Sequence, residues 1–167
     1  MHRSTTLTLR TAERRSVRYR TLDDAVEDAA RLADADAAGR LHATGNWTLG
    51  RALAHLAWWA DEPFTGHRFP LHLRLLFRVL GPLTKRRVFR GDIAVGLRLP
   101  GVAGGTYGVE DRSTREGLAA MREAFDRLDR ECPRRPDVGF GRLSHEQWRT
   151  LHRRHAEHHL SFFRAAE

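Results

Sequence analysis

Apolar residues recur every three or four positions in several stretches of the chain, a period typical of amphipathic helices. The first stretch follows Thr21, a good N-cap with acidic residues after it, and continues from Leu22 until Gly39 stops it. Residues 1–20 are polar and arginine-rich and have no sustained apolar period. We therefore expect a flexible or loosely docked basic arm over residues 1–20 and a single domain over residues 21–167.

Two further helices are predicted in the middle of the chain. Residues 48–62 carry an apolar stripe that Pro63 closes. Residues 71–80 form a shorter piece, which the pair Gly81-Pro82 ends. The chain then enters a long irregular segment that contains Gly91, Gly96, Gly101, Gly104, Gly105 and Gly108. Segments of this length inside a compact domain are more often binding loops or lids than spacers.

Two capping boxes mark the last two helices. Residues 113–116 and residues 144–147 each place a serine three positions before a glutamate or glutamine, ahead of a helical pattern. The pattern thus predicts four main helices, one short extra helix and a long loop between the third and fourth main elements. An all-α four-helix bundle is the economical way to bury four apolar stripes. The longest strand-like pattern covers only Ile93 to Leu99.

The charge balance bears on the partners that the chain can take. Its 167 residues include 29 Lys and Arg against 21 Asp and Glu, a formal net charge of +8. The basic residues cluster in the arm and in residues 85–90. No zinc-finger, RNP-like or convincing helix-turn-helix pattern accompanies them. A solvated arginine-rich surface is therefore the favoured interpretation, an anionic small ligand comes next, and nucleic-acid binding is disfavoured.

Cysteine content and hydropathy indicate a compartment. The single cysteine, Cys132, forms no internal bridge and belongs to no metal-binding cysteine pair, which favours a reducing environment. The first residues lack the apolar core of a secretory signal, and charged residues interrupt the most apolar stretch, residues 71–80. We expect a cytoplasmic protein with no membrane partner.

Three histidines suggest a metal site. His155 and His159 are four residues apart, so they lie on the same face of the last predicted helix, inside its apolar stripe. With His55 as a third ligand, three neutral imidazoles would leave one corner of a tetrahedral ion open, as in catalytic zinc sites. The alternative stays open that backbone carbonyls or carboxylates satisfy the two helical histidines instead.

The remaining histidines have weaker patterns. His152 and His158 fall toward the edges of the apolar face, and His2, His42, His67, His72 and His145 lack partners at ligand spacing. All of these are predicted to be surface or loop residues. His145-Glu146 has Arg149 where a zinc-protease helix needs its second histidine, so protease chemistry is not supported.

The predicted helix that carries His55 brings other candidates onto one face. On a helical wheel, Arg51, Trp58, Trp59 and Glu62 lie close to His55 and apart from the leucine stripe. This placement predicts that His55 looks into a cleft at the edge of the bundle. Glu62 and Arg51 are candidate catalytic residues, and Trp58 and Trp59 are candidate cofactor-binding residues. In the alternative interpretation, the tryptophans are ordinary core aromatics and Glu62 is a surface carboxylate.

The order of these motifs resembles that of the DinB/YfiT-like superfamily of four-helix bundles. The resemblance covers residues 21–167 and is based on the histidine within residues 47–57 and on the paired histidines of residues 155–159. Residues 140–144, Trp148 and a last helix of the type H-x3-H-L-S-F-F are similar to an uncharacterised branch. One departure is that many relatives continue with Arg-Gly-Gln where this chain has Leu-Ser-Phe after the last histidine.

The resemblance implies a site and a chemistry. His55, His155 and His159 would hold a divalent metal, zinc or nickel, and dimers are implied. Characterised relatives include a mycothiol-dependent maleylpyruvate isomerase and S-transferases that use bacillithiol or mycothiol, in which the metal would favour the thiolate. Arg51, or the basic residues from Lys85 onward, would hold the carboxylate of such a low-molecular-weight thiol.

Two classes of function follow. The first is a metal-dependent enzyme acting on a small-molecule substrate, with thiol transfer or isomerisation as its most concrete version. The second is a non-catalytic helical bundle that binds a metal or a small ligand.

Overall fold

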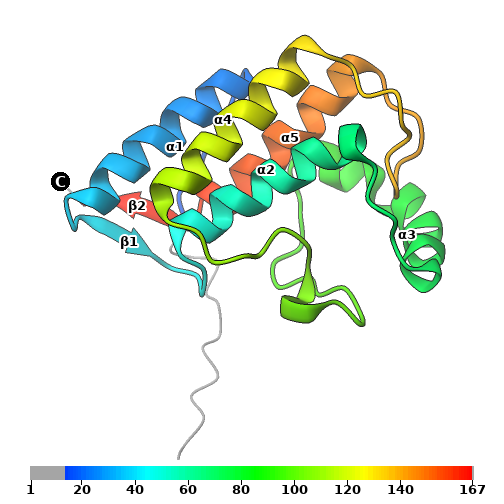
Figure 1. The fold of residues 1–167 in the computed structure, drawn as a ribbon, viewed down its shortest axis with the longest axis horizontal. Helices are drawn as coiled ribbons and strands as arrows, with labels where there is room; N and C mark the ends of the chain where they lie inside the picture. Colours follow the sequence, from blue (N-terminus) through cyan, green and yellow to red (C-terminus); the bar gives the residue numbers. More distant parts are fainter. Residues whose placement is uncertain (1–13, 167) are drawn as a thin grey trace, which may run out of the picture.

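The computed structural model describes residues 14–166, which are mostly helical (Figure 1). The prediction of a mostly helical domain is confirmed. The elements, in chain order, are α1 (Leu22–Ala37), β1 (Leu41–Ala43), α2 (Leu49–Thr65), α3 (Leu71–Arg90), the 3-10 turn η2 (Ala103–Gly105), α4 (Thr114–Arg130), α5 (His145–Leu160) and β2 (Phe163–Ala165). None of the helices among these residues is long and apolar enough to cross a membrane.

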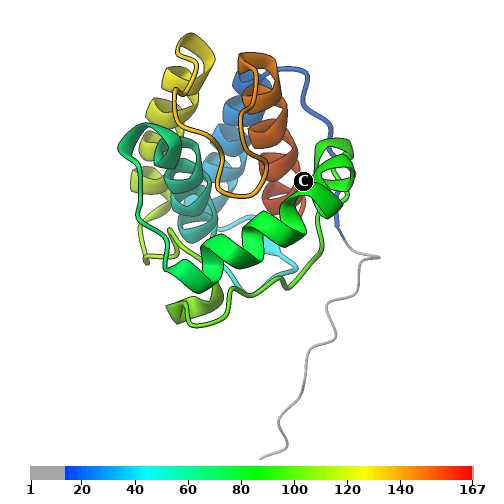
Figure 2. The ribbon, with the colours of Figure 1, turned by 90° about the vertical axis from the view of Figure 1, so that its right-hand side faces the viewer.

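Four helices surround one apolar core, and α3 lies outside it. Helices α1, α2, α4 and α5 run alongside one another, while α3 crosses the end of the group and packs on α5 (Figures 1 and 2). The largest fully buried side chains include Trp148, Phe125 and Met121. The core therefore places α2 and α5, which carry the candidate ligands, in direct contact.

Local capping defines where most helices begin. Thr21, Ser113 and Ser144 each accept a hydrogen bond from the backbone N–H three residues on, and the side chain at that position returns a bond to the cap. These reciprocal bonds satisfy donors that a helix start leaves free, which is why three predicted starts agree with the structure.

Two helices continue beyond the predicted ends. Pro63 lies inside α2, which ends at Thr65 and is capped by Gly66 in the left-handed conformation (φ 76°). A proline this near the end costs only one backbone hydrogen bond. Helix α3 runs through Gly81-Pro82 and, with 20 residues, is not the short piece expected. A Cβ on Gly81 would lie 1.8 Å from the Gly139 carbonyl oxygen, so this glycine allows a loop to cross the helix.

The all-α prediction misses a small sheet. Strands β1 and β2 pair antiparallel, with His42 opposite Arg164. Each strand has three residues, too few to show an alternating pattern in the sequence. The strand-like stretch 93–99, in contrast, forms turns and irregular backbone.

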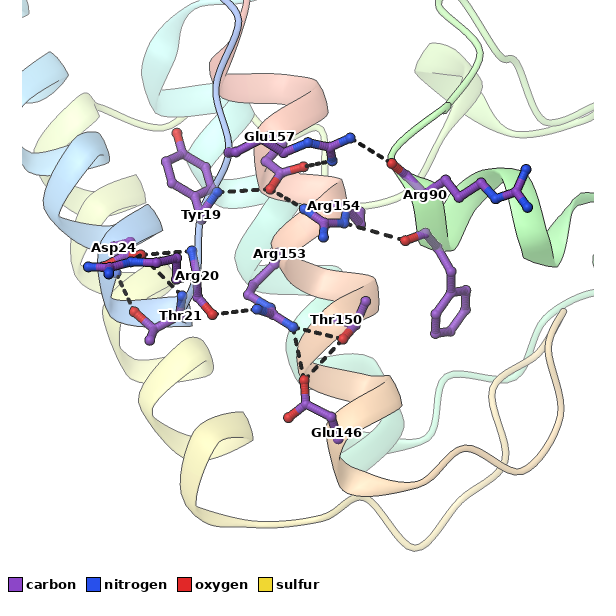
Figure 3. Close-up of polar contacts among 12 residues, drawn as sticks. Tyr19, Arg20, Thr21, Asp24, Arg90, Glu146, Thr150, Arg153, Arg154 and Glu157 are labelled. Atoms are coloured by element: carbon purple, nitrogen blue, oxygen red, sulfur yellow. Dashed lines mark hydrogen bonds and ion pairs between the residues drawn. The ribbon is translucent and has the colours of Figure 1, made fainter.

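The described part of the basic arm is packed against the body. The Tyr19 hydroxyl donates to Asp28 (2.6 Å), and its backbone N–H donates to Glu157 of α5 (2.9 Å). Arg18 also pairs with Glu157 (2.7 Å). Figure 3 shows the bond from the Tyr19 backbone to Glu157, with Arg154 of α5 beside it. Residues 14–20 thus differ from the loosely docked arm predicted, and the rest of that prediction lies outside the described residues.

Helices α2 and α4 approach closely at two glycines. A Cβ on Gly117 of α4 would lie 2.5 Å from the Gly50 carbonyl oxygen, and one on Gly50 would lie 2.2 Å from the Arg112 carbonyl oxygen. Real Cβ atoms do not approach backbone this closely. The pair therefore sets the separation of α2 from α4.

We predict that Gly117→Ala destabilises the protein. Overpacking costs about 1–3 kcal/mol. Because the obstructing atom is a backbone oxygen, we expect the upper part of this range, which exceeds the roughly 1 kcal/mol that alanine gains in a helix interior. The melting temperature should fall by several degrees. Ala119→Ser, at an exposed position of the same helix, is the control and should change little. A Gly117→Ala protein as stable as the wild type would show that the contact does not constrain the two helices.

Candidate metal centre

Three imidazole nitrogens converge between α2 and α5. The Nε2 atom of His155 lies 3.2 Å from Nε2 of His55 and 3.1 Å from Nε2 of His159. Each histidine offers one nitrogen to a group whose members all lie within 4.8 Å of one another. In a tetrahedral zinc site with Zn–N bonds of about 2.0–2.1 Å, ligand nitrogens lie about 3.3 Å apart. The two measured separations are close to that value.

A backbone carbonyl determines the tautomer of His55. Nδ1 of His55 lies 2.7 Å from the carbonyl oxygen of Tyr107. Because an oxygen of this kind only accepts, we infer that Nδ1 carries the proton and donates it. The lone pair of His55 is then on Nε2, which faces the other two histidines. A carbonyl in this role is the usual outer partner of a metal-ligating histidine.

The two short nitrogen–nitrogen contacts among the three rings cannot both be hydrogen bonds. If His155 donates from Nε2 to His55, it has no lone pair there to accept from His159. If it accepts from His159 instead, its lone pair faces the lone pair of His55. One of the two contacts therefore lacks a shared proton in either tautomer of neutral His155.

Burial keeps these imidazoles neutral. It lowers the pKa of His55 to about 4, against an opposing effect of the hydrogen bond to Tyr107. Burial, followed by the mutual repulsion of the charged forms, also lowers the pKa of His155 and of His159 well below 6.5. Neutral imidazole is the form that binds a metal, so all three lone pairs are available at neutral pH.

Aromatic rings enclose the histidines on the α2 side. Trp47 stacks on His159, with ring centroids 5.2 Å apart, and meets His55 edge-on at 5.0 Å. Trp59 contacts His55 edge-on at 6.2 Å. Trp58 does not contact the histidines in this way and instead stacks on Tyr107 at 5.1 Å. The two tryptophans thus contact different parts of the site, Trp59 the ring of His55 and Trp58 the ring of Tyr107.

The long glycine-containing loop covers His55. Gly108 has a φ of 70°, and a Cβ there would lie 2.5 Å from Cβ of Trp58 and 3.3 Å from Cα of His55. Only glycine allows the loop to approach α2 this closely. The loop therefore brings the Tyr107 carbonyl to the histidine by direct backbone packing, beside α2 in Figure 1.

Access to the histidines differs from the prediction. His55 is 3% exposed and does not look into an open cleft, whereas His155 and His159 are partly exposed. A cleft of about 340 Å³ does lie along α2 and α4, and Trp58 and Gly108 are among its lining residues. None of the three histidines lines it. The partly exposed residues of the group are thus the two on α5.

The other predicted site residues lie farther from the nitrogen cluster. Arg51, one helical turn before His55, lies 3.9 Å from Asp111 and has its guanidinium 5.8 Å from the Trp47 ring. It therefore sits at the rim of the aromatic enclosure. Lys85, in the second half of α3, donates to the carbonyl oxygen of Phe140 (3.4 Å). No contact described for Lys85 joins it to the histidines.

Glu62 belongs to a separate group of charges. It is two helical turns beyond His55, about 10 Å along the axis. Burial, and then the nearby Asp137 carboxylate, raise its pKa to about 7, against the opposing charge of Arg135. The described contacts thus do not bring Glu62 to the ligands.

Two histidines predicted to be peripheral are buried. His152 is 3% exposed and His158 is 8% exposed. Among the described residues, neither ring nitrogen of His152 has a hydrogen-bond partner, and the ring stacks on Trp148. On the wheel His152 and His158 lie at opposite edges of the apolar face. In the fold His152 packs against Phe125 of α4, and His158 packs against Phe162. This tertiary cover has no signal in the periodicity of α5.

Sequence reasoning missed the outer partners of the site. The Tyr107 carbonyl is a backbone group, which any residue supplies, so no residue type reveals it. Gly108 was one of many glycines in the loop. Trp47 lies just before the N-cap of α2, where an aromatic residue next to a candidate ligand was a usable signal.

Comparison with known proteins changes the family assignment. A model of the family described as "Protein of unknown function (DUF1569)" matches residues 11–166. No curated protein and no solved structure matches the chain. The match is to this family, and nothing found indicates a DinB/YfiT-like family, so that prediction was wrong. The short histidine motifs on which it was based occur in a chain of another family.

His152 should make stability depend on pH. Burial lowers its pKa from 6.5 to about 3, so the unfolded chain takes up a proton at a pH where the native state does not. The contribution of His152 to stability is complete above pH 6.5 and is lost as the pH falls toward 3, by about 1.4 kcal/mol per unit. Between about pH 7.5 and 5, the free energy of unfolding should therefore fall by roughly 2 kcal/mol less in His152→Leu than in the wild type.

Urea unfolding at both pH values, with a chelator present, measures this difference. The variant should also be at least as stable as wild type at neutral pH, because two unpaired polar atoms are removed. Parallel pH profiles for the two proteins would show that His152 is not buried and neutral in the native state.

Proposed function

We propose that this chain, which belongs to the DUF1569 family of proteins of unknown function, is an enzyme that uses one divalent metal ion held by His55, His155 and His159. The observation that carries the proposal is the convergence of three neutral imidazoles, whose lone pairs cannot all be satisfied by one another. A single ion would accept all three. It would also replace the unfavourable contact between two lone pairs with bonds.

The donor set favours zinc or nickel. Three imidazole nitrogens suit borderline ions, whereas calcium and magnesium prefer oxygen ligands. The Tyr107 carbonyl supports this choice, because it holds His55 in the tautomer whose Nε2 is free to bind. Three protein ligands leave a further coordination position, a feature of catalytic rather than structural sites.

The proposed chemistry is Lewis-acid activation of a small ligand. A bound ion at this site would lower the pKa of a thiol or water at its open position. The chain itself would orient the ligands through Tyr107 and would exclude water from the α2 side through Trp47 and Trp59. Approach from the partly exposed side of His155 and His159 fits a small molecule.

A low-molecular-weight thiol is a proposed co-substrate on chemical grounds alone. A thiolate is a good ligand for zinc and nickel, and a reducing cytoplasm is the proposed setting, because the only cysteine of the chain, Cys132, is exposed and unpaired. Arg51, at the rim of the aromatic enclosure, is the proposed partner for a carboxylate on such a molecule.

A non-catalytic metal-binding role is the second candidate. The observation that favours it is the position of Glu62, the carboxylate with the most suitable pKa, two helical turns from the ligands. Without a nearby acid or base, the site would bind an ion or a small ligand but would not catalyse a reaction.

The first prediction is a metal content of one ion per chain. Untagged protein loaded with zinc or nickel and passed through a desalting column should retain about one equivalent, as measured by elemental analysis. His55→Ala and the double variant His155→Ala/His159→Ala should each retain almost none. Metal should also raise the melting temperature of the wild type but not of these ligand variants.

His158→Asn is the matched control, because His158 is buried on α5 between the two helical ligands but is not in the convergent group. It should bind as the wild type does. Equal retention by the wild type and by the folded ligand variants, checked by circular dichroism, would contradict the site.

A second measurement separates the two candidate functions. Cobalt(II) in place of the native ion gives visible bands that respond to ligand changes. Added azide or 2-mercaptoethanol should shift the bands if the open position exchanges, as the enzyme requires. Bands that do not respond to either probe would leave the non-catalytic role.

A further inference from the structure

Exposed apolar side chains concentrate on the outer side of α3. In the described chain the large hydrophobic residues that are exposed are Leu71, Leu75, Val79, Leu80, Leu83 and Leu97. Four of them, Leu71, Leu75, Val79 and Leu83, follow one another at intervals of four residues and are 55–72% exposed. We call these four residues the outer face of α3. An interval of four advances a helix by only about 40°, so they form one stripe.

The same helix carries only positive charge. Between Leu71 and Arg90 there are six basic residues and no Asp or Glu. Arg74 and Arg78 each precede a member of the outer face, so they flank the stripe along one edge, while Arg86 and Arg87 follow it toward the end of the helix. All four arginines are exposed. The helix thus combines an apolar stripe with cationic flanks.

Within residues 14–166, no element covers this face. Helix α3 turns Leu73 and Gly81 inward and packs on α5, outside the four-helix core (Figure 2). The loop after it stays close to the start of the helix through the contact between His72 Nε2 and the Pro100 carbonyl oxygen (3.2 Å). Leu97 of this loop, 69% exposed, adds to the apolar surface. An arrangement that buries one side of α3 thus presents the other to solvent.

The positive charge of α3 indicates which kind of partner binds its outer face. Pairing with α3 of a second copy would place cationic flanks against each other, because the helix has no acidic residue to oppose them. Nucleic acid would match the charge, but its phosphate backbone would offer no apolar surface to the stripe of exposed leucines. A surface of anionic lipid headgroups matches both properties, since acyl chains accept the leucines and headgroups attract the arginines.

We infer that the outer face of α3 binds anionic membrane surfaces. The helix lies in the plane of the interface, with Leu75 and Val79 inserted among the lipids and Arg74 and Arg78 at the headgroups. This contact does not span the bilayer, and it departs from the prediction that the chain has no membrane partner. It is independent of the metal site, whose ligands lie on α2 and α5.

Vesicle sedimentation with the full chain tests the inference. The probes are vesicles of phosphatidylcholine alone and vesicles of phosphatidylcholine with an equal part of phosphatidylglycerol. We expect binding to the anionic vesicles that weakens as salt is raised, and little binding to the neutral ones. Leu75→Ser/Val79→Ser and Arg74→Gln/Arg78→Gln should each lower the partition coefficient roughly tenfold.

Arg115→Gln/Arg122→Gln is the matched control, because it removes the same charge from exposed positions of α4. It should bind as the wild type does, and circular dichroism establishes that each variant is folded. Binding that the control lowers as much as the α3 variants do would overturn the inference in favour of nonspecific charge attraction.

Three other outcomes would overturn it. One is the absence of binding to anionic vesicles at low salt. Another is salt-sensitive binding to duplex DNA that matches vesicle binding in strength and ignores the Leu75→Ser/Val79→Ser change, which would indicate a nucleic-acid surface. The last is a dimer in analytical ultracentrifugation that the same change dissociates, without vesicle binding, which would assign the face to a second copy.

Discussion

Three neutral imidazoles lie so close together that one of their two short nitrogen–nitrogen contacts has no proton between its atoms. Burial prevents the rings from relieving this contact by taking up protons, because it lowers the pKa of each histidine. The Tyr107 carbonyl prevents His55 from relieving it by changing tautomer. The arrangement is therefore costly by itself. In the proposed centre, an ion that accepts three lone pairs would remove this cost.

The fold positions the three rings through backbone contacts that tolerate little change. The Gly50–Gly117 contact sets the distance between α2 and α4, and the Gly108 backbone holds the loop against α2. The core residues Trp148 and Leu160 fix α5 on the other side. Because the three histidines lie on helices and a loop carbonyl sets the tautomer of His55, the candidate site combines a helical frame with a loop that covers His55.

Sequence periodicity predicted what depends on neighbours along the chain. His155 and His159 share a face because helical geometry requires it, and three helix starts followed from capping residues. What depended on other elements was not predictable: the Tyr107 carbonyl, the burial of His152 under other elements, and the passage of α3 through Gly81-Pro82. The family was also beyond reach, because the assignment was based on a few short histidine motifs, whereas the DUF1569 match covers residues 11–166.

The most direct test of the three-histidine centre is X-ray absorption at the zinc edge of the zinc-loaded protein. The account predicts a first shell of three imidazole nitrogens at about 2.0 Å, recognisable by the scattering of the outer ring atoms, and one further light atom at the open position. A shell that contains sulfur, or one of oxygens with fewer than three imidazoles, would contradict it and place the bound zinc elsewhere on the chain.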